Sequence, residues 1–172
     1  YKEWQNSDFS MRLEPQGQDK IEYFNDANSN QRWQIIFADT GLDTNTGGRL
    51  RKVQKYIDSD VFFATYSDGL SNVNLSQLLQ FHQAHKKIAT LLAVKPLSPF
   101  GILSVNSQDL VEDFKEKPIS KDWVNGGFFI FNRRIFDYIQ DNDILEQEPF
   151  ARLVADNQLV AYKHTGFWAC MD

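Results

Sequence analysis

The pattern of apolar and polar residues along this chain predicts strands that alternate with helices. Apolar runs of strand length, bounded by turn residues, occur at 33–38, 62–66, 89–94, 124–131 and 159–162. Between them, apolar residues recur at helical spacing, first at Leu50, Val53 and Ile57 and then at Leu75, Leu78, Leu79 and His82. Because strands alternate with helices, the pattern predicts an α/β fold with a mostly parallel sheet, in a single domain over 1–172.

The ends of several predicted elements carry local signals. Thr46 is expected to cap the first helix, and Asn74 with Gln77 resembles a capping box at the start of the second. Pro149 is expected in the first turn of a last helix. The other predicted elements are short: strands at 8–13 and 20–23 around a turn at Gly17, a β region at 101–114 that turns at Asn106-Ser107, and a helix at 133–139.

The first candidate for chemistry stands at the end of the run 62–66. Ser67 follows the run, and Asp68 and Gly69 come next. An acid at the carboxyl end of a buried parallel strand lies in the crevice where open α/β sheets bind ligands, and glycine lets a ligand approach the backbone. Asp68 is therefore a candidate for binding a metal ion or a phosphate-linked group. The alternative is a simple Asp-Gly turn.

Two glycine pairs are further candidates, each with a structural alternative. Gly47 and Gly48 at a helix N-terminus would present N–H groups to an anion, with Arg49 adding a contact to phosphate or base. The alternative there is an ordinary capped helix. Gly126 and Gly127 interrupt an apolar strand, which indicates either a β-bulge or the close approach of a ligand. In the second case Asn125 could offer its amide to sugar hydroxyls.

Charged residues supply the remaining candidates. Pro118 is expected to hold Lys117 in an extended conformation, and a lysine fixed in this way can act as a point charge toward a phosphate. The alternative is an exposed, charged strand end. Asp172 could form with Asp68 a carboxylate pair suited to Mg²⁺, although sequence distance does not bring the two together. The histidines lack metal-ligand spacing, and His82 is expected to pack on its helix face.

Composition narrows the class of protein. The chain has 172 residues, 42 % of them hydrophobic, and a net charge of −5, which argues against a nucleic-acid-coating protein and against polybasic membrane attachment. Cys170 is the only cysteine, so neither a disulfide framework nor a thiolate zinc site is expected. No apolar run approaches the roughly 18 residues of a membrane span. By elimination, a cytoplasmic protein is expected.

Taken in order, these motifs resemble the sugar-phosphate nucleotidyltransferase family, most closely its cytidylyl branch. The residues that carry the resemblance are Asp39-Thr40-Gly41, Thr46-Gly47-Gly48-Arg49, Tyr66-Ser67-Asp68-Gly69, the segment 81–90, Phe100-Gly101, the segments 114–118 and 124–129, and the segment 166–172. The resemblance implies a Rossmann-like fold of the nucleotide-diphospho-sugar transferase type. It also implies that CTP and α-D-glucose 1-phosphate are converted to CDP-glucose and pyrophosphate.

The resemblance further implies roles for individual residues and for the whole protein. Asp68 and Lys117 would be catalytic, and Asp68 with Asp172 would bind Mg²⁺. The nucleotide would be contacted by Thr44, Arg49 and Ser67, and the sugar phosphate by Gly101, Glu116, Lys117, Asn125 and Gly126. A homo-oligomer is implied, with no nucleic-acid or membrane partner, in nucleotide-sugar synthesis for surface polysaccharide.

The chain also departs from the family pattern. The family opens with a G-G-x-G-T-R loop and a downstream lysine, and it is several residues longer between Trp4 and Asn6. It usually has glycine where Ser67 stands, and it continues beyond Asp172. We therefore expect a fragment of a longer catalytic domain, with little turnover on its own. Two alternatives stay open: a relative that uses another base or sugar, and a non-catalytic sugar-nucleotide-binding module.

Overall fold

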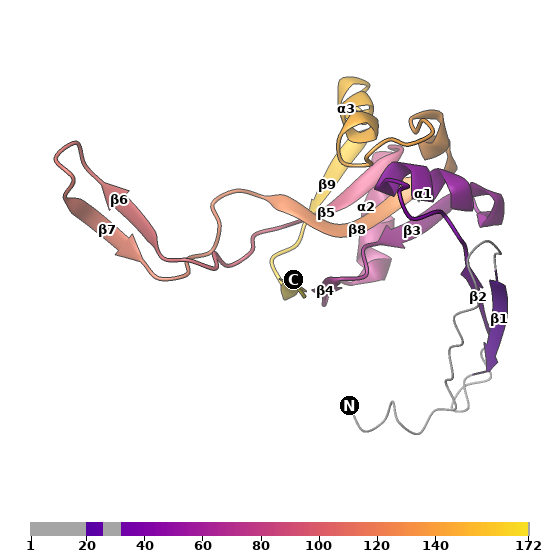
Figure 1. The fold of residues 1–172 in the computed structure, drawn as a ribbon, viewed down its shortest axis with the longest axis horizontal. Coiled ribbons are helices and arrows are strands. Elements are labelled where there is room, and N and C mark those ends of the chain that lie inside the picture. The colour runs from indigo at the N-terminus through magenta and orange to yellow at the C-terminus, as the bar shows by residue number, and fades with distance from the viewer. Residues whose placement is uncertain (1–19, 26–31, 172) are drawn as a thin grey trace. The chain divides into compact units, whose positions relative to one another are not determined.

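The computed structural model describes residues 20–25 and 32–171, drawn in colour in Figure 1. The chain divides into two compact units, residues 1–44 and residues 45–172, which are described separately. The predicted strand at 8–13 and the turn at Gly17 lie outside the described residues. The interpretation of 1–172 as one domain stays a prediction.

The first unit contains an antiparallel pair of strands, β1 (Lys20–Asn25) and β2 (Arg32–Phe37). These strands correspond to the predicted strands at 20–23 and 33–38. After β2 the chain turns at Asp39-Thr40-Gly41, where Asp39 Oδ1 accepts a hydrogen bond from Gly41 N at 2.9 Å. Gly41 has a φ of 84°, in the left-handed region that glycine adopts easily.

The second unit is built on a four-stranded sheet in the order β3 (Val61–Thr65), β8 (Val124–Asn132), β5 (Ala89–Val94) and β9 (Leu159–Lys163). β8 is antiparallel to both of its neighbours, and only the β5–β9 pair is parallel. For the described strands, the prediction of a mostly parallel sheet is therefore wrong. β3 and β5 do run in the same direction, as the strand–helix alternation implied, but β8 lies between them, and a hydrophobic pattern carries no strand direction.

Five helical segments accompany the sheet within the described residues: α1 (Thr46–Val53), η2 (Gln54–Tyr56), α2 (Leu75–His85), η3 (Arg133–Asp137) and α3 (Glu148–Ala155). The predicted helix at 133–139 is a short 3₁₀ helix. In α2 the predicted cap is confirmed, since Asn74 Oδ1 accepts from Gln77 N at 3.0 Å. Leu78 and His82 are buried as predicted, but Leu75 is 51 % exposed, so its predicted inward position is wrong.

Helices cover both faces of the sheet (Figure 1). On one face His82 of α2 lies against β5, where its Nδ1 is 2.8 Å from Thr90 Oγ1. On the other face Phe129 and Phe131 of β8 stack with ring centroids 5.4 Å apart, and Phe150 of α3 meets Phe129 edge-on. Residues of η3 and α1, and Ile57 directly after η2, pack against this aromatic layer. Burial of these large rings contributes to the stability of the second unit through the hydrophobic effect and ring packing.

Two further strand pairs complete the second unit. β4 (Gly69–Ser71) pairs with β10 (Trp168–Cys170), directly after β3. β6 (Ile102–Val105) and β7 (Val111–Lys115) form the predicted hairpin, whose turn is held by Asn106 Oδ1 accepting from the amides of Gln108 and Leu110. All residues of β6 and β7 are exposed.

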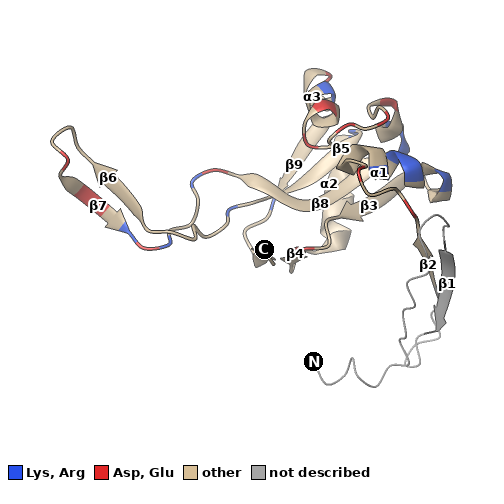
Figure 2. Ribbon diagram, in the orientation of Figure 1, with Lys and Arg blue, Asp and Glu red and all other residues tan. Residues whose placement is uncertain are grey.

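Charged residues are absent from β3, β5 and β8 and stand in the segments around them, as Figure 2 shows. The strands are therefore an apolar scaffold, and polar chemistry is confined to their ends. None of the helices within the described residues combines the length and the apolar character that crossing a membrane requires.

Candidate functional site

Asp68 lies at the end of the sheet where β3 turns into β4. Its backbone oxygen accepts a hydrogen bond from Met171 N at 2.9 Å, and Gly69 pairs with Cys170 across β4 and β10. The Asp68 carboxylate is half-buried and lies 3.7 Å from Cys170 Sγ, which donates to it. The last described residues of the chain therefore lie directly beside Asp68. Its predicted metal-binding partner, Asp172, lies outside the described residues.

The second glycine pair lies at the same end of the sheet. The register between β5 and β8 shifts there, because Leu91 is opposite Phe129 whereas Ala93 is opposite Asn125. Gly127 has a φ of 75°, and a Cβ at this position would lie 3.0 Å from Cδ2 of Tyr66. The β-bulge is thus confirmed, and the backbone that approaches Gly127 closely belongs to the protein itself, since Tyr66 N donates to Gly127 O at 3.0 Å.

Asn125 and Gly126 complete this part of the site. Asn125 is exposed, and its Oδ1 accepts from Gly127 N at 3.0 Å, which leaves the amide nitrogen as the group it can offer to a ligand. Gly126 O accepts a hydrogen bond from Trp168 Nε1 at 2.8 Å, which ties β10 to β8. The sequence analysis did not single out Trp168, because an indole N–H donor leaves no signal in hydrophobic patterning.

Three other predicted residues lie together at the base of the β6–β7 hairpin. A Cβ at Gly101 would lie 3.1 Å from Glu116 Oε2 and 2.9 Å from the Phe114 ring, so this glycine allows the hairpin ends to approach closely. Lys117 has a φ of 44°, in the left-handed region, so the predicted extended conformation is wrong. Such a conformation in a non-glycine residue costs on the order of 1–3 kcal/mol.

The bend at Lys117 has a structural cause. Beyond it the chain forms a bridge between Leu97 and Ile119, flanked by hydrogen bonds from Ser98 N to Pro118 O and from Ser120 N to Pro96 O, both 2.8 Å long. The backbone must turn between β7 and this bridge, and Lys117 lies at the turn. The preference that Pro118 imposes on the residue before it is overridden by this tertiary pairing.

The glycine pair Gly47-Gly48 does not present its N–H groups to an anion, as one interpretation of the sequence expected. Asn45, not Thr46, is the N-cap of α1. The amides of Gly47 and Gly48 donate to the backbone oxygen of Asp143, at 3.0 and 3.3 Å. A Cβ at Gly47 would lie only 2.7 Å from that oxygen. These N–H groups are therefore paired within the protein and are not offered to an anion, although no side chain caps the helix as the structural alternative expected.

The loop that receives α1 is itself held by an ion pair. Asp143 Oδ2 accepts from Arg152 at 2.5 Å and from Gln140 N at 2.9 Å. The hydrogen bond from Arg152 is the largest cause that lowers the pKa of the Asp143 carboxyl below its usual value. Thr46 adds a side-chain contact, donating to Glu146 Oε2 at 3.0 Å. Sequence reasoning missed this loop, since none of its residues belongs to a periodic pattern.

The predicted nucleotide-binding residues are divided between the two units. Arg49 and Ser67 are exposed residues of the second unit, on α1 and beside Asp68. Thr44 belongs to the first unit, where its hydroxyl donates to Thr40 O. Together, the described contacts bring Ser67, Asp68, Asn125 and Gly126 to one end of the sheet and join Gly101 to Glu116. The binding roles of all these residues stay predictions.

The metal-binding role of Asp68 stays a prediction. No group of three or more histidine, cysteine, aspartate or glutamate side chains clusters within the described residues.

Comparisons with known proteins agree with the fold and the motifs. A sequence profile of the nucleotidyl transferase family matches residues 14–169. Over 144 residues, the chain is 39 % identical to a probable glucose-1-phosphate cytidylyltransferase of Bacillus subtilis, covering 83 % of this chain and 56 % of that protein. Over 144 residues it is 41 % identical to the glucose-1-phosphate cytidylyltransferase of Salmonella typhimurium, covering 81 % and 55 %.

A solved structure shows the same fold at low identity. The crystal structure of a putative glucose-1-phosphate thymidylyltransferase from Bacillus anthracis, in complex with sucrose, matches with a TM-score of 0.53 and 14 % identity, covering 74 % of this chain and 56 % of that one. The chain spans just over half the length of the relatives that it matches. The profile match covers most of the sequence, and the chain therefore belongs to the nucleotidyl transferase family.

Proposed function

We propose that the protein transfers a cytidylyl group from CTP to α-D-glucose 1-phosphate, giving CDP-glucose and pyrophosphate. The observation that carries the proposal is the convergence of Asp68, the Asn125–Gly127 bulge and the strand Trp168–Cys170 on one end of the sheet. The names of the two cytidylyltransferase relatives support the choice of base and sugar.

In this proposal each side chain acts by position and charge. The phosphate of the sugar attacks the α-phosphorus of CTP in line and pyrophosphate leaves, with no covalent enzyme intermediate. Lys117 would hold the sugar phosphate, and Glu116, Gly101, Asn125 and Gly126 would bind the sugar. Arg49, Thr44 and Ser67 would contact the nucleotide. The exposed hydroxyl of Ser67, next to Asp68, is a donor that the usual family glycine lacks.

The proposed cofactor is Mg²⁺, held by Asp68 and, in the family pattern, by Asp172. When bound, the cation would neutralise phosphate oxygens during transfer. Asp68 fits this role because its carboxylate is only half-buried and its described side-chain neighbour is the weak donor Cys170, so a hard cation can replace that contact.

We also propose assembly with further copies of the chain. An isolated two-stranded hairpin is marginally stable in water. The β6–β7 hairpin nevertheless exposes apolar side chains on both strands, including Leu103, Val105, Val111 and Phe114, each more than half exposed. A second copy that covers them would explain their presence. Light scattering after size-exclusion chromatography tests this, and a monomer at micromolar concentration would contradict it.

The activity is tested by pyrophosphate release from each nucleoside triphosphate with glucose 1-phosphate, in the full-length protein. We expect CTP to be preferred, and Asp68→Asn to reduce kcat by at least about a thousandfold with unchanged thermal unfolding. Preference for another triphosphate or sugar phosphate would move the protein to another branch of the family. Binding without turnover would support the non-catalytic alternative.

The strained backbone at Lys117 allows a sharper test of its role. Lys117→Gly removes the amine and relieves the left-handed conformation, so it should raise stability by about 1 kcal/mol while greatly raising the KM for glucose 1-phosphate. Asp109→Gly is the matched control, because Asp109 has a φ of 61° in the turn of the same hairpin. It should gain similar stability without any change in KM. Equal kinetic effects of the two substitutions would reject the role of Lys117.

A further inference from the structure

A second polar pocket lies at the opposite end of the sheet from Asp68. β3 begins at Val61, which pairs with Asn132 at the end of β8, whereas Asn125 near the start of β8 lies at the Asp68 end. A cavity of about 220 Å³ opens here. It is lined by Val61, His82, Gln83, Lys86, Lys87, Ile88, Asn132 and Arg134. It shares no residue with the site around Asp68.

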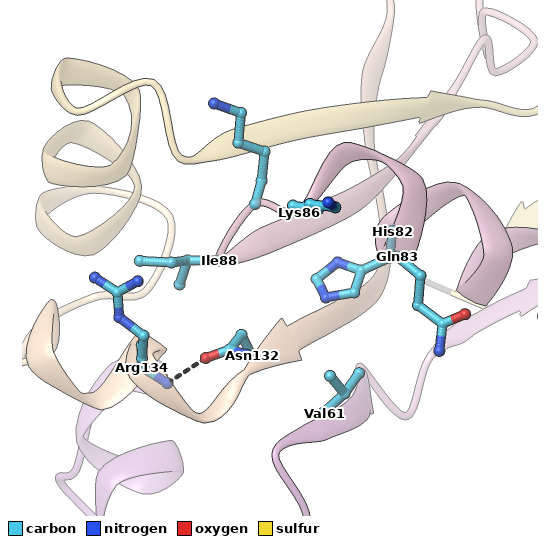
Figure 3. Close-up of a pocket in the computed structure, with 8 residues that line it drawn as sticks. Val61, His82, Gln83, Lys86, Ile88, Asn132 and Arg134 are labelled. Carbon is cyan, nitrogen blue, oxygen red and sulfur yellow. Dashed lines mark hydrogen bonds between the residues drawn. The ribbon is translucent and has the colours of Figure 1, made fainter.

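The lining of this pocket combines an apolar base with polar groups from three elements. Figure 3 shows the imidazole of His82 and the amide of Asn132 on facing sides, with Val61 and Ile88 beside them. His82 is only 2 % exposed, and its Nδ1 is engaged with Thr90 Oγ1 at 2.8 Å, which leaves Nε2 as its second polar atom. Asn132 Oδ1 accepts from Arg134 N at 2.9 Å, so the amide is fixed in place.

The charged side chains that line this pocket are all positive. Lys86, Lys87 and Arg134 contribute three cations, and no aspartate or glutamate lines the pocket, although the chain as a whole carries a net charge of −5. Within the described residues, no ion pair neutralises any of these three. Three uncompensated cations around a concave surface raise the local concentration of anions.

The positions of the cations decide between two explanations. Lys86 and Lys87 follow the C-terminus of α2, and basic residues commonly stand there to offset the negative end of a helix. Arg134 belongs to a different element, the five-residue helix η3, so capping of α2 does not account for its position at the same pocket. Because these three cations come from two elements and line one pocket, capping of α2 alone does not explain them, and an anionic ligand would.

We propose that this pocket binds a small phosphoryl anion, of the size of phosphate or pyrophosphate. Lys86 and Lys87 would supply point charges and Arg134 a bidentate contact, while the Asn132 amide would donate a hydrogen bond. Burial lowers the pKa of His82, so the imidazole is neutral at neutral pH and can donate from Nε2. A volume of about 220 Å³ is too small for a whole nucleotide sugar.

The experiment is a titration of inorganic pyrophosphate, and separately of phosphate, into the isotope-labelled full-length protein. Amide signals of Ile88 and Asn132 and ring signals of His82 report on this pocket, whereas signals of Gly69 and Gly126 report on the Asp68 end. We expect saturable shifts in the first group, at submillimolar pyrophosphate and 150 mM NaCl, that persist in Asp68→Asn. Absence of saturation at several millimolar would overturn the proposal, as would shifts confined to the Asp68 end.

Matched variants separate specific binding from general attraction to positive charge. Lys87→Gln with Arg134→Gln should weaken pyrophosphate binding at this pocket at least tenfold. Lys95→Gln with Lys163→Gln removes the same charge from two lysines that lie over the Trp123 ring, and it should leave binding unchanged. Lys87→Arg keeps the charge and should retain binding, which guards against a folding artefact. Equal weakening by both double variants would overturn the proposal.

Discussion

The two glycine pairs of this chain look alike in sequence and do different things in the structure. The amides of Gly47 and Gly48 donate hydrogen bonds to the backbone carbonyl of Asp143. Gly126-Gly127 forms a bulge one strand away from Asp68, and its backbone also holds Trp168. Both pairs permit close approach of a backbone, yet only the second lies where the sheet ends beside a carboxylate. A glycine pair in the sequence indicates that another group approaches the backbone closely. Whether that group is part of the protein or a ligand depends on where the pair lies in the fold.

The largest effect expected from this comparison is on activity, at the second pair. In Gly126→Ala the added Cβ would lie 3.1 Å from Leu92 O and from Val94 Cγ1, so β8 or these neighbours must give by a few tenths of an ångström. Because a displacement of about 1 Å can cost about a hundredfold in rate, we expect this smaller shift to lower kcat/KM by about tenfold. Steady-state kinetics measure it. An unchanged kcat/KM would mean that the bulge only shapes the sheet.

At the first pair the expected effect is on stability. Gly47→Ala places a Cβ 2.7 Å from the Asp143 oxygen, which a backbone atom cannot easily relieve. After the gain in helix propensity, we expect a loss of about 2 kcal/mol in the free energy of unfolding. Denaturant unfolding measures this loss. Activity well below the melting temperature should change less than threefold, and a large kinetic defect would instead restore the anion-binding interpretation.

The ion pair between Asp143 and Arg152 holds the loop that accepts the Gly47 and Gly48 amides. It should make the stability of the protein depend on pH. Asp143→Asn is expected to cost about 1–2 kcal/mol at pH 7, because it weakens a charged hydrogen bond to Arg152. The pKa of Asp143 is lowered in the folded state, so its contribution is present above the usual aspartate value near about 3.9 and is lost as the pH falls through the folded pKa. Wild type and variant should therefore converge in acid. A constant difference down to pH 2 would show another cause.

The smallest effect is expected at Tyr66, whose ring contacts Gly127. Its hydroxyl is the buried side-chain polar atom that lacks a hydrogen-bond partner within the described residues. Tyr66→Phe removes a hydroxyl that is desolvated on folding and gains no hydrogen bond. The free energy of unfolding should therefore stay within about 0.5 kcal/mol or rise by up to about 1 kcal/mol. Thermal unfolding measures this change. A loss above 1 kcal/mol would show that the hydroxyl has a partner in solution.

Local features of the fold could be predicted from the sequence because they rest on local physics. The Asn74 cap, the Asn106 turn and the buried position of Leu78 follow from side-chain chemistry and periodicity. Strand order could not be predicted, because the pattern of 124–131 is the same for a strand running in either direction. The position of β8, antiparallel between β3 and β5, was therefore not predicted.

The candidate site was predicted through its residue types more than through its geometry. Asp68 at the end of a strand followed from a simple rule, and the structure places it at that end. The contact between Asp68 and the segment ending at Met171 joins residues more than a hundred positions apart, which no local signal reveals. Lys117 was misjudged because the proline rule is local, whereas the bridge between Leu97 and Ile119 is not.

The sole cysteine of the chain has a practical consequence. Cys170 is exposed and its sulfur lies 3.7 Å from the Asp68 carboxylate. A fluorophore or spin label coupled to this thiol would need no engineered attachment point in this part of the protein. Its emission or mobility would then follow events at the carboxylate in real time, so this chain carries its own reporter position.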